Sequence, residues 1–152
     1  MKKKRRTIKT KIIGIILLVS IVTIAVGFSI SIYNSIRNFK TEMISNTTMN
    51  ARFIAEYSSA PLSFRKPENI NEMLSNLQPI PYIQNVIIYD NKGNTFAKPY
   101  DRSGEDFEPP LVRPESYHHF DGEYLHIFEP IVYKSKQYGT IYMRASTENL
   151  YE

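Results

Sequence analysis

The longest apolar stretch of the chain runs from residue 12 to residue 32, and these 21 residues include no charge. At ~1.5 Å per residue, a helix of this length would measure ~31 Å, close to the ~30 Å hydrocarbon thickness of a bilayer. A core helix of a soluble protein would keep a polar face, whereas this stretch has only Ser and Thr as polar residues, and their hydroxyls can bond to their own helix. The pattern therefore predicts a transmembrane helix over residues 12–32.

A three-four spacing of apolar and amide side chains follows over residues 33–59, which contain neither Pro nor Gly. The transmembrane helix is therefore expected to continue into one long helix. This spacing is typical of a coiled coil, in which a seam Asn fixes the register and favours two strands. A helix packed on its own domain shows a similar stripe, and the two alternatives can hold along different turns. The stripe consists of Ile36, Phe39, Met43, Asn46, Asn50, Phe53 and Tyr57, of which Ile36, Phe39, Met43 and Asn50 are the expected dimer contacts.

Proline marks the end of the long helix and the limits of a second, shorter one. Pro61 is expected to break or kink the long helix, because proline lacks the backbone N–H. The second helix should begin at Pro67, which suits a first-turn position, and end by Pro79. Its apolar positions recur at i, i+3, i+4 and i+7, as on one helix face. They are Ile70, Met73, Leu74 and Leu77.

Beyond the second helix, short runs rich in β-branched and aromatic residues predict strands separated by turns such as Asp90-Asn91-Lys92-Gly93. The polar, proline-rich residues 101–116 are expected to form a long loop. The fold class is thus α+β: a transmembrane helix continuing into a long helix, then a five-stranded antiparallel sheet with helices on one face. The long loop, a ligand or a partner would cover the other face. The expected strands are residues 83–89, 94–100, 117–120, 123–133 and 137–145.

The charge distribution predicts the orientation in the membrane. Seven of the first eleven residues are basic, which leaves 12 basic and 15 acidic residues, a net charge of −3, in the remainder. Basic flanks stay cytoplasmic, so the N-terminus is expected inside and the rest outside the plasma membrane. Ala25-Val26-Gly27 resembles a signal-peptide cleavage site, but the apolar run continues past it, which favours an uncleaved anchor. The expected parts are a cytoplasmic tail (1–11), a transmembrane helix (12–32), a membrane-proximal helix (33–59) and a periplasmic domain (60–152).

The residues that could carry chemistry favour binding over catalysis. The chain has no Cys, no Gly-x-Ser-x-Gly and no His-Glu-x-x-His, so no enzyme activity is expected in it. His118, His119 and His126 lie near Asp121 and Glu123, a set that could hold zinc. Adjacent strand residues face opposite sides, however, so at most one of the first two can join His126. Neither a metal site nor a cofactor is expected, and pH sensing by these histidines stays an alternative.

Ligand binding would draw on the many aromatic residues, 11 Tyr and 8 Phe, and on nearby cations. Lys98, Arg102 and Arg144 could receive a small anion, although charges at strand ends are more often simply solvated. The basic tail could bind nucleic acid, but it adjoins the membrane span and the remainder is acidic, so no nucleic-acid partner is expected. The candidate ligand-binding residues are Lys98, Tyr100, Arg102, His126, Tyr142 and Arg144.

Several short motifs occur in a fixed order along the chain. They are Ala60-Pro61-Leu62-Ser63-Phe64 with Leu74, Leu77 and Ile83, then Tyr89-Asp90, Gly93, Phe96-Ala97 and Tyr100, then Pro130-Ile131 and Tyr138-Gly139-Thr140-Ile141-Tyr142-Met143.

This ordered set, from about Asn34 to Glu152, resembles the eighth type of CHASE domains, the cyclase- and histidine-kinase-associated sensory extracellular domains. The resemblance implies a PAS-like periplasmic sensor fold, usually dimeric, placed between two membrane helices of a receptor. It also implies a cytoplasmic output, either a histidine kinase of a two-component system or a diguanylate cyclase. The motifs depart from the family pattern at residues 65–67, at Pro99 and at residues 134–136, which affects local loop geometry.

Two functions are consistent with these features. The first is the sensor segment of a membrane receptor, which acts as a homodimer, binds a small molecule or a periplasmic protein, and passes the signal through its long helix. The alternative is a membrane-tethered periplasmic binding module with no output domain. In both, the chain crosses the inner membrane once as given, with its N-terminus in the cytoplasm.

Overall fold

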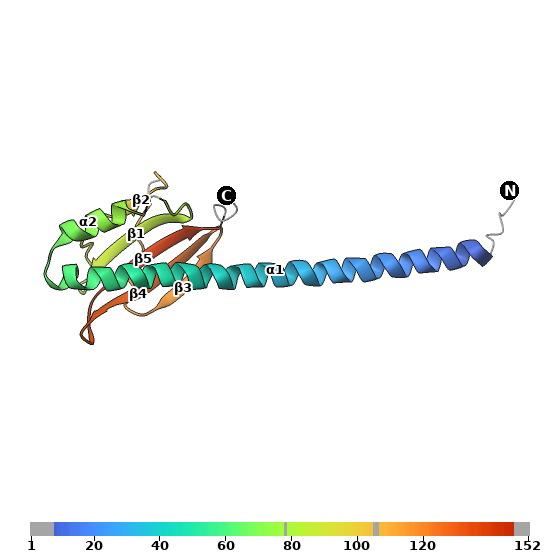
Figure 1. Cartoon of the computed structure of the whole chain (residues 1–152), viewed down its shortest axis with the longest axis horizontal. Helices are drawn as coiled ribbons and strands as arrows, with labels where there is room; N and C mark the ends of the chain where they lie inside the picture. The colour runs from blue at the N-terminus through green and yellow to red at the C-terminus, as the bar shows by residue number, and fades with distance from the viewer. Residues whose placement is uncertain (1–7, 78, 105–106, 148–152) are drawn as a thin grey trace. The chain divides into compact units, whose positions relative to one another are not determined.

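The computed structural model describes residues 8–77, 79–104 and 107–147. The basic tail as far as residue 7 and the expected exit segment at residues 148–152 lie outside this range. The chain divides into two compact units, residues 1–42 and residues 43–152. In chain order (Figure 1), the elements are α1 (Ile8–Ser63), α2 (Pro67–Ser75), β1 (Ile83–Asp90), β2 (Tyr100–Asp101), β3 (Tyr117–Asp121), β4 (Tyr124–Tyr133) and β5 (Lys136–Ser146).

The first unit contains the apolar part of α1. Among the described residues, α1 is the one helix long and apolar enough to cross a membrane. Its large apolar side chains between residues 12 and 32 are all more than half exposed, as a lipid-facing surface requires. The hydroxyls of Thr23 and Ser29 donate to the carbonyls four residues earlier, at 2.9 and 2.8 Å, so both polar groups are satisfied within the helix. These features agree with the predicted transmembrane helix.

The long helix does not break where the sequence predicted, because α1 continues through Pro61 to Ser63. Proline costs a helix one backbone hydrogen bond and crowds the preceding turn. Here it lies two residues before the last residue of the helix, so little helix remains to be disturbed. The carbonyl of Pro61 accepts from the N–H of Lys66 at 2.8 Å and helps to close the turn into α2, which has proline in its first turn as predicted.

In the second unit, the five strands form one antiparallel sheet of order β2-β1-β5-β4-β3. The end of α1 and the whole of α2 cover one face of this sheet (Figure 1). The residues of α1 that are buried recur every three or four positions from Met43 to Leu62, which gives one inward stripe. This confirms the α+β class with helices on one face. We call this the helix face; the alternating residues of β1, β4 and β5 that point to it are mostly Val, Ile, Leu and Met.

The opposite face is covered by the loop between β2 and β3, and we call it the loop face. Phe107 and Val112 of this loop pack on a buried cluster that includes Phe128 and Tyr142. The hydroxyl of Tyr89 donates to the carbonyl of Pro110 at 3.1 Å and fixes the middle of the loop. The sequence left the long loop, a ligand or a partner as the possible cover of this face. The structure shows that the loop covers it.

The predicted strand over residues 94–100 is wrong. In this region, pairing with β1 is limited to an isolated bridge between Tyr89 and Thr95 and to the two-residue strand β2. Pro99 has no N–H to donate to a ladder, and the N–H of Lys98 donates instead to Oδ1 of Asn71 in α2, at 2.9 Å. The other four predicted strands agree with the structure to within one residue at each end.

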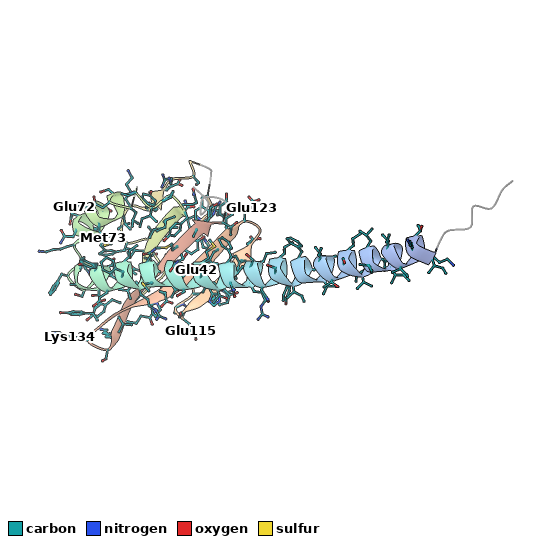
Figure 2. The ribbon with its side chains drawn as sticks, turned by 45° about the vertical axis from the view of Figure 1, so that its right-hand side comes forward. Glu42, Glu72, Met73, Glu115, Glu123 and Lys134 are labelled. Carbon is teal, nitrogen blue, oxygen red and sulfur yellow. The ribbon has the colours of Figure 1, made fainter. Side chains whose placement is uncertain are left out.

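The turns that join the strands use the residues that the sequence indicated. Gly93 has φ +81° in the turn after β1, where the Asp90 carboxylate accepts from two backbone N–H groups. Gly122 has φ +58° between β3 and β4. Glu123 at this turn and Lys134 at the β4–β5 turn mark opposite ends of β4, as the labels in Figure 2 show.

Candidate functional site

Three of the predicted ligand-binding residues lie together on the loop face. In the register of the sheet, His126 of β4 is opposite Arg144 of β5, and Tyr142 points to the same face two residues away. His126 Nδ1 and the Tyr142 hydroxyl oxygen are 2.8 Å apart. The alternation of β4 and β5 thus brings a basic, an aromatic and an imidazole side chain to one place under the loop.

His119 of β3 completes this group by stacking on His126, with ring centroids 4.7 Å apart and planes 14° apart. The neighbouring His118 points to the helix face, as the alternation of strand residues predicted. We call His119, His126 and Tyr142 the histidine–tyrosine cluster. Nδ1 of His119 is buried and has no hydrogen-bond partner among the described residues.

Arg144 is a buried cation, with 6% of its surface exposed. Its guanidinium lies 3.7 Å from the ring centroid of Tyr124 and 5.0 Å from that of Phe107. Such cation–π contacts stabilise a guanidinium away from bulk water. Phe107 also stacks on Tyr142 at 5.9 Å, so the loop closes directly over Arg144 and the cluster.

Burial determines the protonation states of the cluster. It raises the pKa of the Tyr142 hydroxyl well above its ordinary value, so this group stays protonated. Burial also lowers the pKa of His126 from 6.5; His119 and Arg144 lower it further, while Asp121 acts in the opposite direction. At neutral pH His126 is therefore neutral, and its Nδ1 shares one hydrogen bond with the Tyr142 hydroxyl.

We predict that the domain loses stability on mild acidification because of His126. The pKa of this group is lower in the folded chain than in the unfolded one, so the unfolded chain binds the proton first. The free energy of unfolding should be greatest above pH 6.5, fall as the pH drops through that value, and level off below the folded-state pKa. Urea unfolding of the full chain in detergent micelles, followed by circular dichroism between pH 7.5 and 5.5, measures this.

His126→Gln should flatten that pH profile, and His118→Gln should leave it unchanged because His118 is exposed on the other face. The lowered pKa values of Asp90 and Asp101 keep both carboxyls outside this pH window. An unchanged pH profile in His126→Gln would contradict the assignment.

The other three predicted ligand-binding residues lie elsewhere. Lys98 and Tyr100 line a hollow of about 520 Å³ between α2 and β2. Arg102, just after β2, donates from Nη1 to the carbonyl of Ile80 at 3.1 Å. The structure thus divides the six predicted residues between the loop face and the β2 edge, and ligand binding by either group stays a prediction.

A second hollow, of about 460 Å³, lies between α1 and the β3–β4 edge on the helix face, and none of the predicted ligand-binding residues lines it. At its base lies Glu129 of β4, which is 5% exposed. One carboxylate oxygen of Glu129 accepts from Ser116 Oγ at 2.6 Å, and the other accepts from Arg52 Nε of α1 at 3.3 Å. We call this the Glu129 hollow. Its lining residues include Ile44, Ser45, Thr48, Met49, Arg52, Ser116, Tyr117, His118, Ile127 and Glu129.

A sequence signal for this hollow does exist. Within the predicted strand 123–133, the inward positions 125, 127, 129 and 131 are Leu, Ile, Glu and Ile. A single acid in an apolar alternation indicates a buried carboxylate that needs a partner. Its partner Arg52 is 77 residues away in the sequence, so the pattern alone could not name it.

The four expected dimer contacts differ in their surroundings. Ile36 is 54% exposed and Met43 only 2% exposed, while Asn50 donates to the hydroxyl of Tyr82 at 2.6 Å. Phe53 and Tyr57, each 60% exposed, lie four residues apart on the outer side of α1, with ring centroids 4.7 Å apart. We call these two residues the exposed apolar stripe. Dimerisation stays a prediction, and this stripe provides a surface for it.

Comparison with known proteins identifies a family for this chain. The CHASE8 family model, described as a periplasmic sensor domain, matches residues 39–144. No curated protein and no solved structure matches the chain. The matched segment includes the Glu129 hollow and the residues of the histidine–tyrosine cluster.

Proposed function

Because the chain belongs to the CHASE8 family of periplasmic sensor domains, we propose that it is the extracytoplasmic sensing segment of a membrane signal-transduction receptor. It binds a small ligand or a periplasmic protein and passes the signal through α1. The apolar helix and the family together fit a membrane protein with an extracytoplasmic domain. A sensor domain alone is not catalytic, so a kinase or cyclase activity would belong to the receptor of which this chain is the sensing part.

The observation that carries this proposal is that α1, a single helix of 56 residues, contains both the apolar segment and the inward stripe on the sheet. A helix shared by the membrane segment and the ligand-binding domain can transmit a shift of ~1–2 Å, which is a common mode of switching at helix interfaces. The chain would act as a homodimer in the inner membrane, with α1 of one copy beside α1 of the other. The basic tail would hold the N-terminus in the cytoplasm.

We predict that the domain is accessible from outside the inner membrane. The chain has no cysteine, so single cysteines can be introduced without background. Leu111 is 92% exposed in the loop, and Leu111→Cys should react with a membrane-impermeant maleimide in intact spheroplasts. Lys9→Cys, at the other end of the apolar segment, should react only after the membrane is permeabilised. Gel shift of the labelled chain measures both reactions.

The reverse labelling pattern would place the domain in the cytoplasm and contradict a periplasmic sensor. Labelling at both positions in a soluble fraction would contradict the membrane anchor. Buried Ile88→Cys in the same domain provides the control for folding, since a folded domain protects this position on both sides of the membrane.

A further inference from the structure

The Glu129 hollow places a buried acid beside a partly unused basic group. Arg52 contacts Glu129 only through Nε, and its two terminal amino groups form no hydrogen bond with any described residue. The Arg52 side chain is 67% exposed and that of Glu129 is 6% exposed. The hollow therefore offers a buried acceptor, the Glu129 carboxylate, and exposed donors, the two terminal amino groups of Arg52.

We infer that the Glu129 hollow binds a small zwitterion, namely a free α-amino acid with an apolar side chain. The ligand ammonium binds the Glu129 carboxylate, and the ligand carboxylate binds the terminal amino groups of Arg52. This inference rests on the proposed sensor function and names the class of ligand and the place where it binds.

Three properties of the hollow select this class. Each carboxylate oxygen can accept more than one hydrogen bond, so Glu129 can receive an ammonium while it keeps Ser116 and Arg52. The guanidinium fork matches a carboxylate in a bidentate way. Apolar groups of Ile44, Met49 and Ile127 line the same space, and its volume of about 460 Å³ lies within the ~300–1,000 Å³ range of small-molecule pockets.

A ligand with a single charge fits less well. An anion alone would approach the buried Glu129 carboxylate, and like charges repel at short distance. A cation alone would leave the guanidinium fork unused and add positive charge beside Arg52. A zwitterion places its ammonium beside Glu129 and its carboxylate beside Arg52, and it leaves the net charge of the hollow unchanged.

The hollow also links ligand binding to the helix. Arg52 is on α1, whereas Glu129 is on β4. A zwitterion held by both side chains adds a bridge between helix and sheet and favours the arrangement in which the two are closest. Binding at this site would thus act directly on the element that carries the signal.

The test uses the full chain in lipid nanodiscs and isothermal titration calorimetry with L-leucine, L-methionine and L-phenylalanine. At least one should bind. For the tightest binder, Glu129→Gln and Arg52→Gln should each weaken affinity by at least about tenfold, roughly the effect of losing one charge-assisted contact. Glu56→Gln, which removes an exposed acid one turn further along α1, is the matched control and should not change affinity.

Ligand analogues keep the test independent of how well the variants fold. Of the probes related to L-leucine, 3-methylbutylamine lacks the carboxylate and 4-methylpentanoate lacks the ammonium. Both should bind the unchanged chain at least about tenfold more weakly than L-leucine. If L-methionine or L-phenylalanine binds more tightly than L-leucine, the amine and the acid that correspond to that amino acid are used instead.

Absence of binding by all three amino acids would overturn the inference and leave the Arg52–Glu129 pair as a structural clasp. Equal binding of the amine analogue, or unchanged affinity in a folded Glu129→Gln variant, would overturn it too. Failure of the proposed sensor function would be seen separately, in the labelling of Leu111→Cys, because that result does not depend on any ligand.

Discussion

Gly139→Ala is expected to lower the free energy of unfolding of the domain by about 3 kcal/mol, the upper end of the usual cost of overpacking. Gly139 lies in β5, the central strand, where it is paired with Asp90 of β1 and Ile131 of β4. A Cβ atom at this position would overlap the backbone carbonyl of Tyr89 and would approach Cδ2 of Leu62 to 2.7 Å. A backbone atom in a paired strand cannot move aside as a flexible side chain can, so the sheet itself has to shift.

Urea unfolding of the full chain in micelles, followed by circular dichroism, measures this loss. Lys136→Ala, exposed at the start of the same strand, is the control and should change stability by less than about 0.5 kcal/mol. Leu62→Ala combined with Gly139→Ala should recover little stability, because the clash with the Tyr89 carbonyl remains. An unchanged unfolding midpoint in Gly139→Ala would show that α1 and β1 do not approach β5 as closely as described.

The close approach at Gly139 also affects the proposed signalling mode. Leu62, near the end of α1, lies against this glycine, which is in the strand adjacent to β1 and β4. The sheet therefore contacts the helix here through the Leu62 side chain, which packs directly on the β5 backbone because glycine has no side chain. In the proposed signalling mode, a shift of β5 would act on α1 at this contact.

The strands were predictable where local composition and turn residues determined their structure. Residues 117–145 are rich in β-branched and aromatic side chains and are divided by short turns, so β3, β4 and β5 were predicted to within one residue of their observed ends. The second strand was predicted wrongly, because the N–H of Lys98 bonds to Asn71 of α2, a contact 27 residues apart. Local sequence cannot show such a competitor for a ladder hydrogen bond.

The same distinction holds for the two candidate sites. The stacking of His119 on His126 follows from the register of one hairpin, and the sequence already placed at most one of the two adjacent histidines beside His126. The Glu129 hollow needs α1, β4 and the end of the long loop, so its geometry depends on how helix and sheet pack. The apolar alternation around Glu129 could have indicated a buried carboxylate, although it was not predicted; the identity of its partners is a property of the tertiary structure.

The sequence also could not predict which side of α1 faces the sheet. The predicted seam included both Met43 and Phe53, yet Met43 is 2% exposed and Phe53 is 60% exposed. Two stripes with similar spacing occupy different sides of this helix, and one of them packs on the sheet. The sequence left both uses open because several turns carry apolar residues on more than one side.

A pair of substitutions two residues apart on α1 should separate these two sides. Ala51 is fully buried on the inward stripe, and Ala51→Glu places a carboxylate against the apolar helix face of the sheet. An unpaired buried charge is among the most destabilising single changes, so we expect a loss of at least about 4 kcal/mol, a large share of a typical domain stability of ~5–15 kcal/mol. Phe53→Glu, on the exposed apolar stripe, should change the stability of the monomer by less than about 1 kcal/mol.

The same pair tests the proposed dimer, because the change at Phe53 introduces like charges where two copies of α1 would meet. Sedimentation equilibrium in micelles should show that Phe53→Glu weakens self-association at least about tenfold while the circular dichroism spectrum stays folded. Phe53→Leu, which keeps an apolar side chain, should retain most of the association. If Phe53→Glu associates as well as the unchanged chain, the exposed apolar stripe is not the dimer surface. If Ala51→Glu is as stable as Phe53→Glu, the inward stripe of α1 does not pack on the sheet, and the route by which the domain would move the helix is lost.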